Sequence, residues 1–269
     1  MHAEQAARDR RPQPRHTAPA RLSGTALGIT GTYTLFRPMD TSRLRYDSSI
    51  CISGLTASGK TTHAHLLAGE FGLTYVSGSQ IQLNFLGVSP IQTKDFWITG
   101  EAKKLWDADQ FRRIDAELLR IEAAMQGCVF DTSTMPWRHR SAAFCIWLES
   151  DLPSRVIKSI VSHRGRNQFP VQDYPTRIAE KDQATISMYR SLYGIEIGGD
   201  FLPFDMIVNI SPLIKAATLE ASLQSITIAH RFIRGASAFH LTGKAPFLDD
   251  LRRAQSEHPD VLKRCALLE

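Results

Sequence analysis

The chain has 269 residues, which suffice for one sizeable α/β domain with extensions at its ends. Its 43% of hydrophobic and 22% of charged residues are typical of a globular protein, and its longest apolar stretches are strand-sized, which predicts no membrane span. The formal net charge of +5 arises within residues 1–45, which hold 8 Lys or Arg and 3 Asp or Glu. The remainder is neutral, so a nucleic-acid partner, which calls for a basic stripe on folded structure, is not expected.

Composition divides the chain into predicted regions. Residues 1–23 are rich in Arg, Pro, Ala and His, and we expect a disordered basic tail there. Residues 24–46 carry scattered β-type residues between glycines, which predicts an N-terminal arm or a small hairpin. Residues 47–235 are predicted to form the main domain, and 236–269 a C-terminal helical extension.

Cysteine usage indicates a reducing environment. Cys51, Cys128, Cys145 and Cys265 form no Cys-x-x-Cys pair and no Cys/His spacing typical of metal ligands. Three of them lie in apolar, strand-like runs, where cysteine usually packs as a small hydrophobic residue. No charged start followed by an apolar segment marks a secretory signal, so we expect a cytoplasmic protein with free thiols.

Strand-like and helix-like segments alternate along the chain from residue 48 onward. The predicted strands are 48–53, 73–77, 128–131, 143–148 and 204–210. The predicted helices are 60–71, 109–126, 153–164, 173–193 and 213–234, with an amphipathic segment near the C-terminus. This alternation favours an α/β fold whose parallel sheet is covered on both faces, with the ligand at the carboxyl ends of the strands.

A phosphate-binding motif follows the first strand, since residues 54–61 read Gly-Leu-Thr-Ala-Ser-Gly-Lys-Thr and match G-x-x-x-x-G-K-[ST]. Backbone N–H groups in such a loop form an anion nest, and the helix that begins at Lys60 adds its positive dipole end. We expect Lys60 to reach the β- and γ-phosphates of ATP and the Thr61 hydroxyl to ligate Mg²⁺. The residues expected to bind ATP are Gly54, Thr56, Ala57, Ser58, Gly59, Lys60, Thr61 and Thr62.

Five segments in order carry a family likeness: ISGLTASGKTT, FGLTYVSGSQI, AAMQGCVFDTS, FCIWLESDLPSRVIKSI, and MYRSLYGIEI followed by FDMIVNIS. From Ile50 to about Leu213 the chain resembles the nucleoside monophosphate kinases, and among them the archaeal-type cytidylate kinases. The resemblance implies a three-layer P-loop kinase fold with a central, mainly parallel five-stranded sheet, helices on both faces and a helical lid at about 151–198. It also implies ATP as phosphoryl donor and a separate pocket for a small-molecule phosphate acceptor.

Phosphoryl transfer needs positive charge around the moving group, and relatives supply it with lid arginines. The cations of the lid region are Arg155, Lys158, Arg164, Arg166, Arg177, Lys181 and Arg190. Arg155 and Lys158 match a family pair only with a one-residue insertion after them, and Lys181 falls where the family usually has arginine. We expect Arg155, Arg177 and Arg190 to be catalytic together with Lys60.

Asp131 closes the buried strand at 128–131 and is the remaining catalytic candidate. At the carboxyl end of the strand it is expected to orient Mg²⁺-bound water, or to accept a hydrogen bond from the phosphate acceptor. Thr61 and Asp131 are thus the predicted metal site. The alternative is a structural cap that bonds backbone amides of the following turn.

The acceptor side departs from the family pattern. Leu83 and Ser133 stand where relatives carry arginines that grip the acceptor phosphate, and Arg138 and Arg140 are candidate replacements. The aromatic residues nearby either pack in the core or form a stacking wall for a planar acceptor. They are Phe85, Phe96, Trp97, Trp106 and Phe111. The predicted acceptor-binding residues are Ser77, Gln80, Asp131, Trp137 and Arg138.

These patterns leave more than one function open. The first is a cytidylate-kinase-like enzyme that phosphorylates a nucleotide or nucleotide-like acceptor with ATP. The second is a kinase of a specialised metabolite on the same core, favoured by the missing acceptor arginines. The third is an ATP-binding regulatory module without catalysis, favoured by the thinned lid arginines. The oligomeric state stays open.

Overall fold

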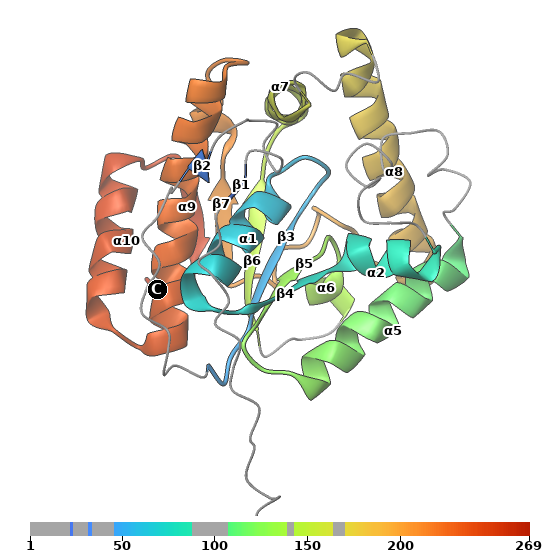
Figure 1. The fold of residues 1–269 in the computed structure, drawn as a ribbon, viewed down its shortest axis with the longest axis horizontal. Coiled ribbons are helices and arrows are strands. Elements are labelled where there is room, and N and C mark those ends of the chain that lie inside the picture. The colour runs from blue at the N-terminus through green and yellow to red at the C-terminus, as the bar shows by residue number, and fades with distance from the viewer. Residues whose placement is uncertain (1–21, 24–31, 34–45, 88–106, 139–142, 164–169) are drawn as a thin grey trace, which may run out of the picture.

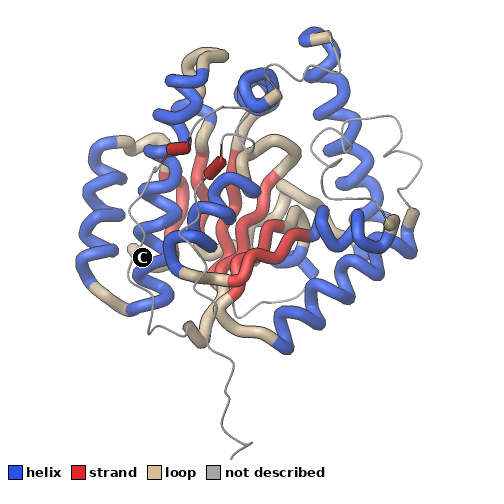
Figure 2. The backbone as a smooth tube through the Cα atoms, viewed as in Figure 1, coloured by secondary structure: helices blue, strands red, loops and turns tan. Residues whose placement is uncertain are grey.

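The computed structural model describes residues 22–23, 32–33, 46–87, 107–138, 143–163 and 170–269. Within them, a six-stranded sheet of order β4-β5-β3-β6-β7-β8 crosses the molecule between helices (Figures 1 and 2). Its strands are β3 (Ile50–Gly54), β4 (Thr74–Ser77), β5 (Cys128–Asp131), β6 (Phe144–Glu149), β7 (Met206–Asn209) and β8 (Leu262–Cys265). The helices are α1 (Lys60–Phe71), α2 (Gly78–Phe85), α5 (Ala108–Ala124), α6 (Met135–Arg138), α7 (Leu152–Ser162), α8 (Tyr174–Tyr193), α9 (Leu219–Thr242) and α10 (Ala245–Glu257).

The five strands that the sequence predicts form the parallel part of the sheet. β3 pairs with β5 and β6, β4 pairs with β5, and β6 pairs with β7, all in parallel. Every residue of β3 and β5 is buried, as expected for strands that helices cover on both faces. The predicted α/β fold with a central, mainly parallel sheet is confirmed.

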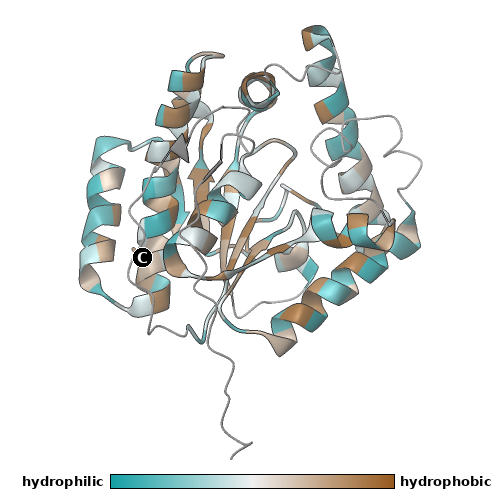
Figure 3. Cartoon of the chain, viewed as in Figure 1, coloured by the Kyte–Doolittle hydropathy of each residue, from teal (hydrophilic) through white to brown (hydrophobic). Residues whose placement is uncertain are grey.

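Two hydrophobic cores lie on opposite faces of the sheet, because successive strand residues point to opposite sides. Ile50 and Ile52 join the core under α1, α9 and α10, while Cys51 between them joins the core under α5, α6 and α8. Figure 3 shows the apolar strands between helices with hydrophilic outer faces. All four cysteines are buried and free, as predicted.

Helix α1 has the bounds that the sequence predicts. Ala64, Leu67 and Phe71 face the core, at the helical spacing expected of one buried stripe. Gly72 ends the helix with a φ of 68°, and its N–H donates to the carbonyl oxygen of Ala68. Glycine adopts this left-handed conformation without strain, so the helix stops there.

The C-terminal residues correct the predicted boundary after residue 235. Helix α9 continues through that point to Thr242, α10 packs against it, and β8 then pairs antiparallel with β7. Gly235 permits the close approach of the two helices, because a Cβ there would lie 3.3 Å from Leu251 Cβ and from the carbonyl oxygen of Phe247. The segment 236–269 is therefore part of the central sheet and its cover, and not a separate helical extension.

Two short strands precede the main domain. β1 (Leu22–Ser23) and β2 (Thr32–Tyr33) pair antiparallel, so the hairpin considered for 24–46 starts within the predicted tail. The rest of residues 1–45 lies outside the described residues. No helix in the described part of the chain combines the length and the apolar character needed to cross a membrane.

Candidate active site

The loop from Gly54 to Gly59 turns the chain from β3 into α1. Its backbone has positive φ angles at Gly54 (157°), Ala57 (63°) and Gly59 (103°). A Cβ at Gly54 would lie 2.5 Å from Ser58 Oγ and 2.7 Å from the carbonyl oxygen of Leu148, so only glycine fits there. The loop thus leads directly into the N-terminus of α1, where backbone N–H groups attract anions.

Two ammonium groups lie against this loop. Lys60 Nζ donates to the carbonyl oxygens of Gly54 (2.8 Å) and Leu55 (3.0 Å), and Lys158 Nζ of α7 donates to the carbonyl oxygen of Ser58. Burial lowers the pKa of Lys60. Burial, together with the neighbouring Lys60 ammonium, lowers the pKa of Lys158 to about 7. The loop therefore gathers positive charge that an anionic ligand stabilises.

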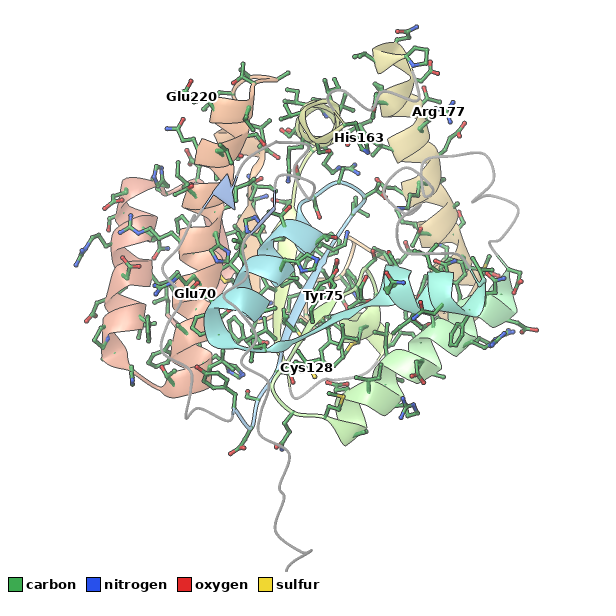
Figure 4. All side chains as sticks on the ribbon, viewed as in Figure 1. Glu70, Tyr75, Cys128, His163, Arg177 and Glu220 are labelled. Atoms are coloured by element: carbon green, nitrogen blue, oxygen red, sulfur yellow. The ribbon has the colours of Figure 1, made fainter. Side chains whose placement is uncertain are left out.

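Asp131 lies opposite the start of α1, at the end of β5. Its Oδ2 accepts hydrogen bonds from Thr61 Oγ1 at 2.6 Å and from Tyr75 Oη at 2.9 Å. Burial and the Asp131 carboxylate raise the pKa of Tyr75, so this phenol keeps its proton and donates. Figure 4 labels Tyr75, which lies on β4 at the edge of the sheet. The structure thus brings together Thr61 and Asp131, the two residues predicted to hold a metal ion.

Lys181 of α8 adds a further cation near this carboxylate. Burial and the nearby Lys60 ammonium lower its pKa to about 8, while the Asp182 and Asp131 carboxylates act in the opposite direction. These mutual effects place Lys181 within electrostatic reach of Lys60 and Asp131. Lys181 immediately precedes Asp182, whose carboxylate accepts from Thr56 N–H, so α8 brings Lys181 close to the loop.

Arg155 of α7 and Asp182 of α8 meet at the same loop. Both side chains are buried, at 6% and 7% exposure, and they form an ion pair. Asp182 Oδ1 accepts from Thr56 N–H at 2.9 Å, while Arg155 donates to the carbonyl oxygens of Thr56 and Ser150, each at 3.0 Å. Arg155 thus lies at the loop, as the sequence predicts, although its partners are protein groups.

The other two predicted lid arginines lie elsewhere on α8. Arg177 pairs with Asp173 at 3.7 Å and shares a helix face with Lys181 one turn further on; Figure 4 labels it high on α8, above the sheet. Arg190 is exposed and pairs with Glu196 at 2.5 Å. Nine residues beyond Lys181, it lies about 13 Å further along the helix. The position of Arg190 therefore does not support its predicted place in the catalytic group, because α8 carries it away from the loop.

Helix α2 defines the surroundings of the predicted acceptor side. Ser77 Oγ caps this helix by accepting from Gln80 N–H at 3.3 Å, and Gln80 Nε2 donates to Asn84 Oδ1 at 2.9 Å. Leu83 is 1% exposed and packs inside the protein. Leu83, which the sequence comparison predicted to stand at an acceptor-arginine position, is thus part of the hydrophobic interior.

Trp137 belongs to an aromatic cluster rather than to the surroundings of Asp131. Its ring meets Phe204 and Trp147 edge-on, with centroids 4.7 Å and 5.2 Å apart. Its Nε1 donates to the carbonyl oxygen of Asp200 at 2.6 Å. These contacts of Trp137, which the sequence predicted to bind the acceptor, are those of core packing.

Arg138 is held by a second group of side chains. Its guanidinium lies 3.5 Å from the ring centroid of Tyr193, and its Nε lies 3.5 Å from Asp115 Oδ2. Burial raises the pKa of Asp115, whose Oδ1 accepts from Tyr189 Oη at 2.7 Å. Cation–π contact and ion pairing thus position Arg138, the residue considered as a replacement for the missing arginines.

A narrow groove begins beside Lys158. α7 forms one wall, and the turn after β7 with the start of α9 forms the other. The lining residues are Ile157, Lys158, Val161, Ile214, Ala216, Ala221 and Ser222. Its lining is largely apolar, and in this structure its walls lie too close together for a ligand to enter without side-chain movement.

Known proteins resemble this chain over its central part. A cytidylate kinase of Pyrococcus horikoshii is 31% identical over 163 residues, which are 60% of this chain and 79% of that protein. The chain belongs to the cytidylate kinase family. A cytidylate kinase of Methanoculleus marisnigri is 29% identical over 160 residues, 60% of this chain and 83% of that protein. No protein-family model matches the chain.

Solved structures resemble this chain only weakly. A shikimate kinase from Bacteroides thetaiotaomicron is 12% identical, with a TM-score of 0.39 over 70% of this chain and 98% of the other. A dephospho-CoA kinase from Campylobacter jejuni is also 12% identical, with a TM-score of 0.34 over 71% and 98%. Together with the cytidylate kinase relatives, the phosphate-binding loop supports a phosphotransferase that acts on a nucleotide or small molecule.

Within this family, the site contains residues that the sequence prediction did not select. Lys158 and Lys181 lie at the loop; the three-residue spacing of Arg155 and Lys158 was the available signal, because it places both on one helix face. No local pattern marks Tyr75 or Asp182. Several residues named from the sequence lie outside the described residues: Phe96, Trp97, Trp106, Arg140, Arg164 and Arg166.

Proposed function

We propose that this protein is an ATP-dependent kinase of the cytidylate kinase type, which moves the γ-phosphoryl group of ATP to a nucleotide or nucleotide-like acceptor. The observation that carries the proposal is the convergence of Lys60, Lys158 and the Thr61–Asp131 pair around one phosphate-binding loop. An oxygen of the acceptor attacks the γ-phosphorus while the bond to the β-phosphate oxygen breaks. The protein's task is to hold both molecules in line and to stabilise the spreading negative charge.

The cations divide this task. The N–H groups of the loop and Lys60 hold the β- and γ-phosphates, and Lys60 leaves the carbonyl oxygens of Gly54 and Leu55 to do so. Lys181, approaching from α8, faces the transferred group from the other side. As an ammonium it supplies a point charge where relatives place a bidentate arginine.

The Thr61 hydroxyl and Asp131 carboxylate fit Mg²⁺, because hard cations prefer oxygen ligands and Mg²⁺ in kinases is held by few protein groups plus the phosphates. Their oxygens already lie 2.6 Å apart. When bound, Mg²⁺ neutralises charge on the β- and γ-phosphates. Tyr75 donates to the same carboxylate oxygen and fixes its orientation at the end of β5.

The base of ATP is placed in the groove between α7 and the start of α9. Lys158 joins this groove to the loop, since it lines the groove and contacts the carbonyl oxygen of Ser58. An apolar slot beside a phosphate site suits a planar base once the side chains of its two walls move apart.

Ala216→Trp tests this placement, because the larger side chain fills the groove at an exposed position where the fold tolerates it. We expect KM for ATP to rise about tenfold, equivalent to about 1.4 kcal/mol of binding, with kcat little changed. The matched control is Ala217→Trp, an exposed neighbour outside the groove lining. Equal KM values for the two variants would contradict the placement.

The affinity for ATP is expected to depend on pH through Lys158. The pKa of Lys158 is about 7 in the free protein and rises when phosphate binds. At a pH between the pKa of the free protein and that of the complex, ATP binding is therefore accompanied by uptake of a proton. Affinity is therefore flat below pH 7 and falls as the pH rises from 7 to 8, by at most about tenfold per unit. Calorimetry in two buffers of different ionisation enthalpy measures the proton uptake.

Lys158→Arg is the control for this dependence, since a guanidinium keeps its charge throughout the range. In this variant, the affinity for ATP should depend less steeply on pH between pH 7 and 8. A slope equal to that of the unchanged protein would assign the titration to another group.

An acceptor screen tests the function as a whole. Purified protein is incubated with ATP and Mg²⁺ and one of CMP, dCMP, UMP or AMP, and ADP formation is followed. ADP release above the acceptor-free rate, with CMP or a related nucleotide preferred, is the expected result. Release with none of the four would reject the nucleotide acceptor.

A small-molecule kinase is the second candidate, favoured by the buried Leu83 and by the engagement of Arg138 with Asp115 and Tyr193. An acceptor phosphate carries about two charges near neutral pH and needs cations when it is buried. Ordinary kcat/KM with CMP would remove this candidate. A regulatory ATP-binding module, in turn, predicts slow ATP hydrolysis that no acceptor stimulates.

A further inference from the structure

Asp182 is a buried carboxylate of the lid helix α8 that contacts the phosphate-binding loop directly. One oxygen accepts from Thr56 N–H at 2.9 Å, across 126 residues of sequence, and the other pairs with Arg155. Arg155 in turn donates to the carbonyl oxygen of Thr56 at 3.0 Å. The Thr56 peptide unit thus lies between a carboxylate and a guanidinium from two different helices.

Each of these three residues contacts the other two, and we call Thr56, Arg155 and Asp182 together the Thr56 clamp. Both charged side chains are less than a tenth exposed, and each carboxylate oxygen has a partner. Burying an ion pair is favourable only when further hydrogen bonds satisfy it, as the Thr56 peptide and the Ser150 carbonyl do here. The clamp therefore specifies one arrangement of α7, α8 and the loop.

The clamp sets the direction of Lys181, the residue that precedes Asp182 on α8. Successive residues point about 100° apart around a helix, so anchoring Asp182 on one side of the loop fixes where Lys181 points. Asp182 contacts Thr56, so Lys181 beside it lies close to the loop, and its pKa responds to Lys60 and Asp131. A small rotation of α8 would displace this ammonium from that position.

We propose that Asp182 is a positioning residue, whose shared bonds to Thr56 N–H and Arg155 hold α8 so that Lys181 faces the phosphoryl group in transfer. The inference rests on the proposed function for its effect on catalysis. The contact of Asp182 with the loop does not depend on it. Asp182 itself touches no reacting atom.

A double-mutant cycle tests this role. Asp182→Asn is expected to lower kcat up to about 100-fold, because a displacement of 1 Å costs that much, while KM for ATP changes less than about threefold. If Asp182 acts through Lys181, then Asp182→Asn has little further effect on kcat in a Lys181→Ala background. Asp182→Glu, which keeps the charge, should restore part of kcat. Additive effects of the two substitutions would overturn the proposal.

Hydrogen exchange provides a second measurement that needs no turnover. The amide of Thr56 should exchange faster in Asp182→Asn than in the unchanged protein, measured by mass spectrometry of peptides covering 54–60. The matched control is Gln183→Ala, an exposed neighbour on α8 whose side chain bonds only to Ser187 among the interactions described. It should leave both exchange and kcat unchanged.

The two measurements separate failure of the inference from failure of the proposed function. Absence of turnover in the unchanged protein with every acceptor would reject the kinase function, and exchange at Thr56 would then decide on the clamp alone. Unchanged exchange in Asp182→Asn would overturn the clamp. Melting temperatures of all variants show whether lost activity reflects unfolding.

Discussion

Lys60→Ala is expected to lower kcat for phosphoryl transfer about 10²- to 10³-fold, the effect of removing one preorganised electrostatic group at developing charge. Lys60 is the cation of the loop itself, and in the free protein it is bonded to two loop carbonyl oxygens, 2.8 Å and 3.0 Å away. Alanine removes the charge, while the glycines that permit the backbone conformation of the loop stay in place. Single-turnover assays with ATP and the preferred acceptor measure the loss.

Folding must be retained for this loss to be meaningful. The core under α1 depends on Ala64, Leu67 and Phe71 and not on Lys60, so the melting temperature should stay within a few degrees of the unchanged protein. Lys244→Ala, an exposed lysine before α10, is the matched control and should retain full activity. Retained turnover in Lys60→Ala would contradict the proposed donor site.

Asp131→Asn is expected to lower kcat/KM about 100-fold and to raise the Mg²⁺ concentration needed for half-maximal rate about 10- to 100-fold. The substitution keeps the shape and one oxygen acceptor but removes the charge that holds the metal ion. The amide oxygen can still accept from Thr61 and Tyr75, which already share one carboxylate oxygen, so the loss is mainly one of charge. Rates measured across a Mg²⁺ titration separate weaker metal binding from a lower rate at saturating Mg²⁺.

The structural alternative for Asp131 makes a different prediction. If the carboxylate served only to cap the end of β5, Asp131→Asn would change the melting temperature and leave the Mg²⁺ requirement as it was. Tyr75→Phe is a useful companion, because it removes one donor to Asp131 and keeps the charge. It should lower the rate less than Asp131→Asn does.

Features that depend on short stretches of chain were predictable from the sequence. The strand at Cys128–Asp131 is a short apolar run closed by an acid, and α5 shows the helical spacing of Ile114 and Leu118 that its burial confirms. Helix α6, with four residues, and β8, with an irregular register beside Ile207, escaped prediction because neither is long enough for periodicity to show.

The fate of individual side chains was harder to predict. Arg190 lies on α8, which the sequence outlined well, and its partner is Glu196. Trp137 lies on the unpredicted α6, and its partners are Trp147 and Phe204. A cation near a site in sequence is free to pair with any acid that the fold brings close. Which acid this is depends on helix rotation, and a rotation of one residue changes the direction by about 100°.

The sequence by itself determined the phosphate-binding loop, because its spaced glycines and lysine stand between a strand and a helix. It also determined the parallel sheet, because strands and helices alternate, and the family, because five segments in order resemble it. Only the tertiary structure decided which side chains serve that loop. Lys158, Lys181 and Asp182 reach it from helices about a hundred or more residues further along the chain. Their positions depend on how α7 and α8 pack against the rest of the protein. A charged side chain is stable in the interior only where that packing supplies a partner.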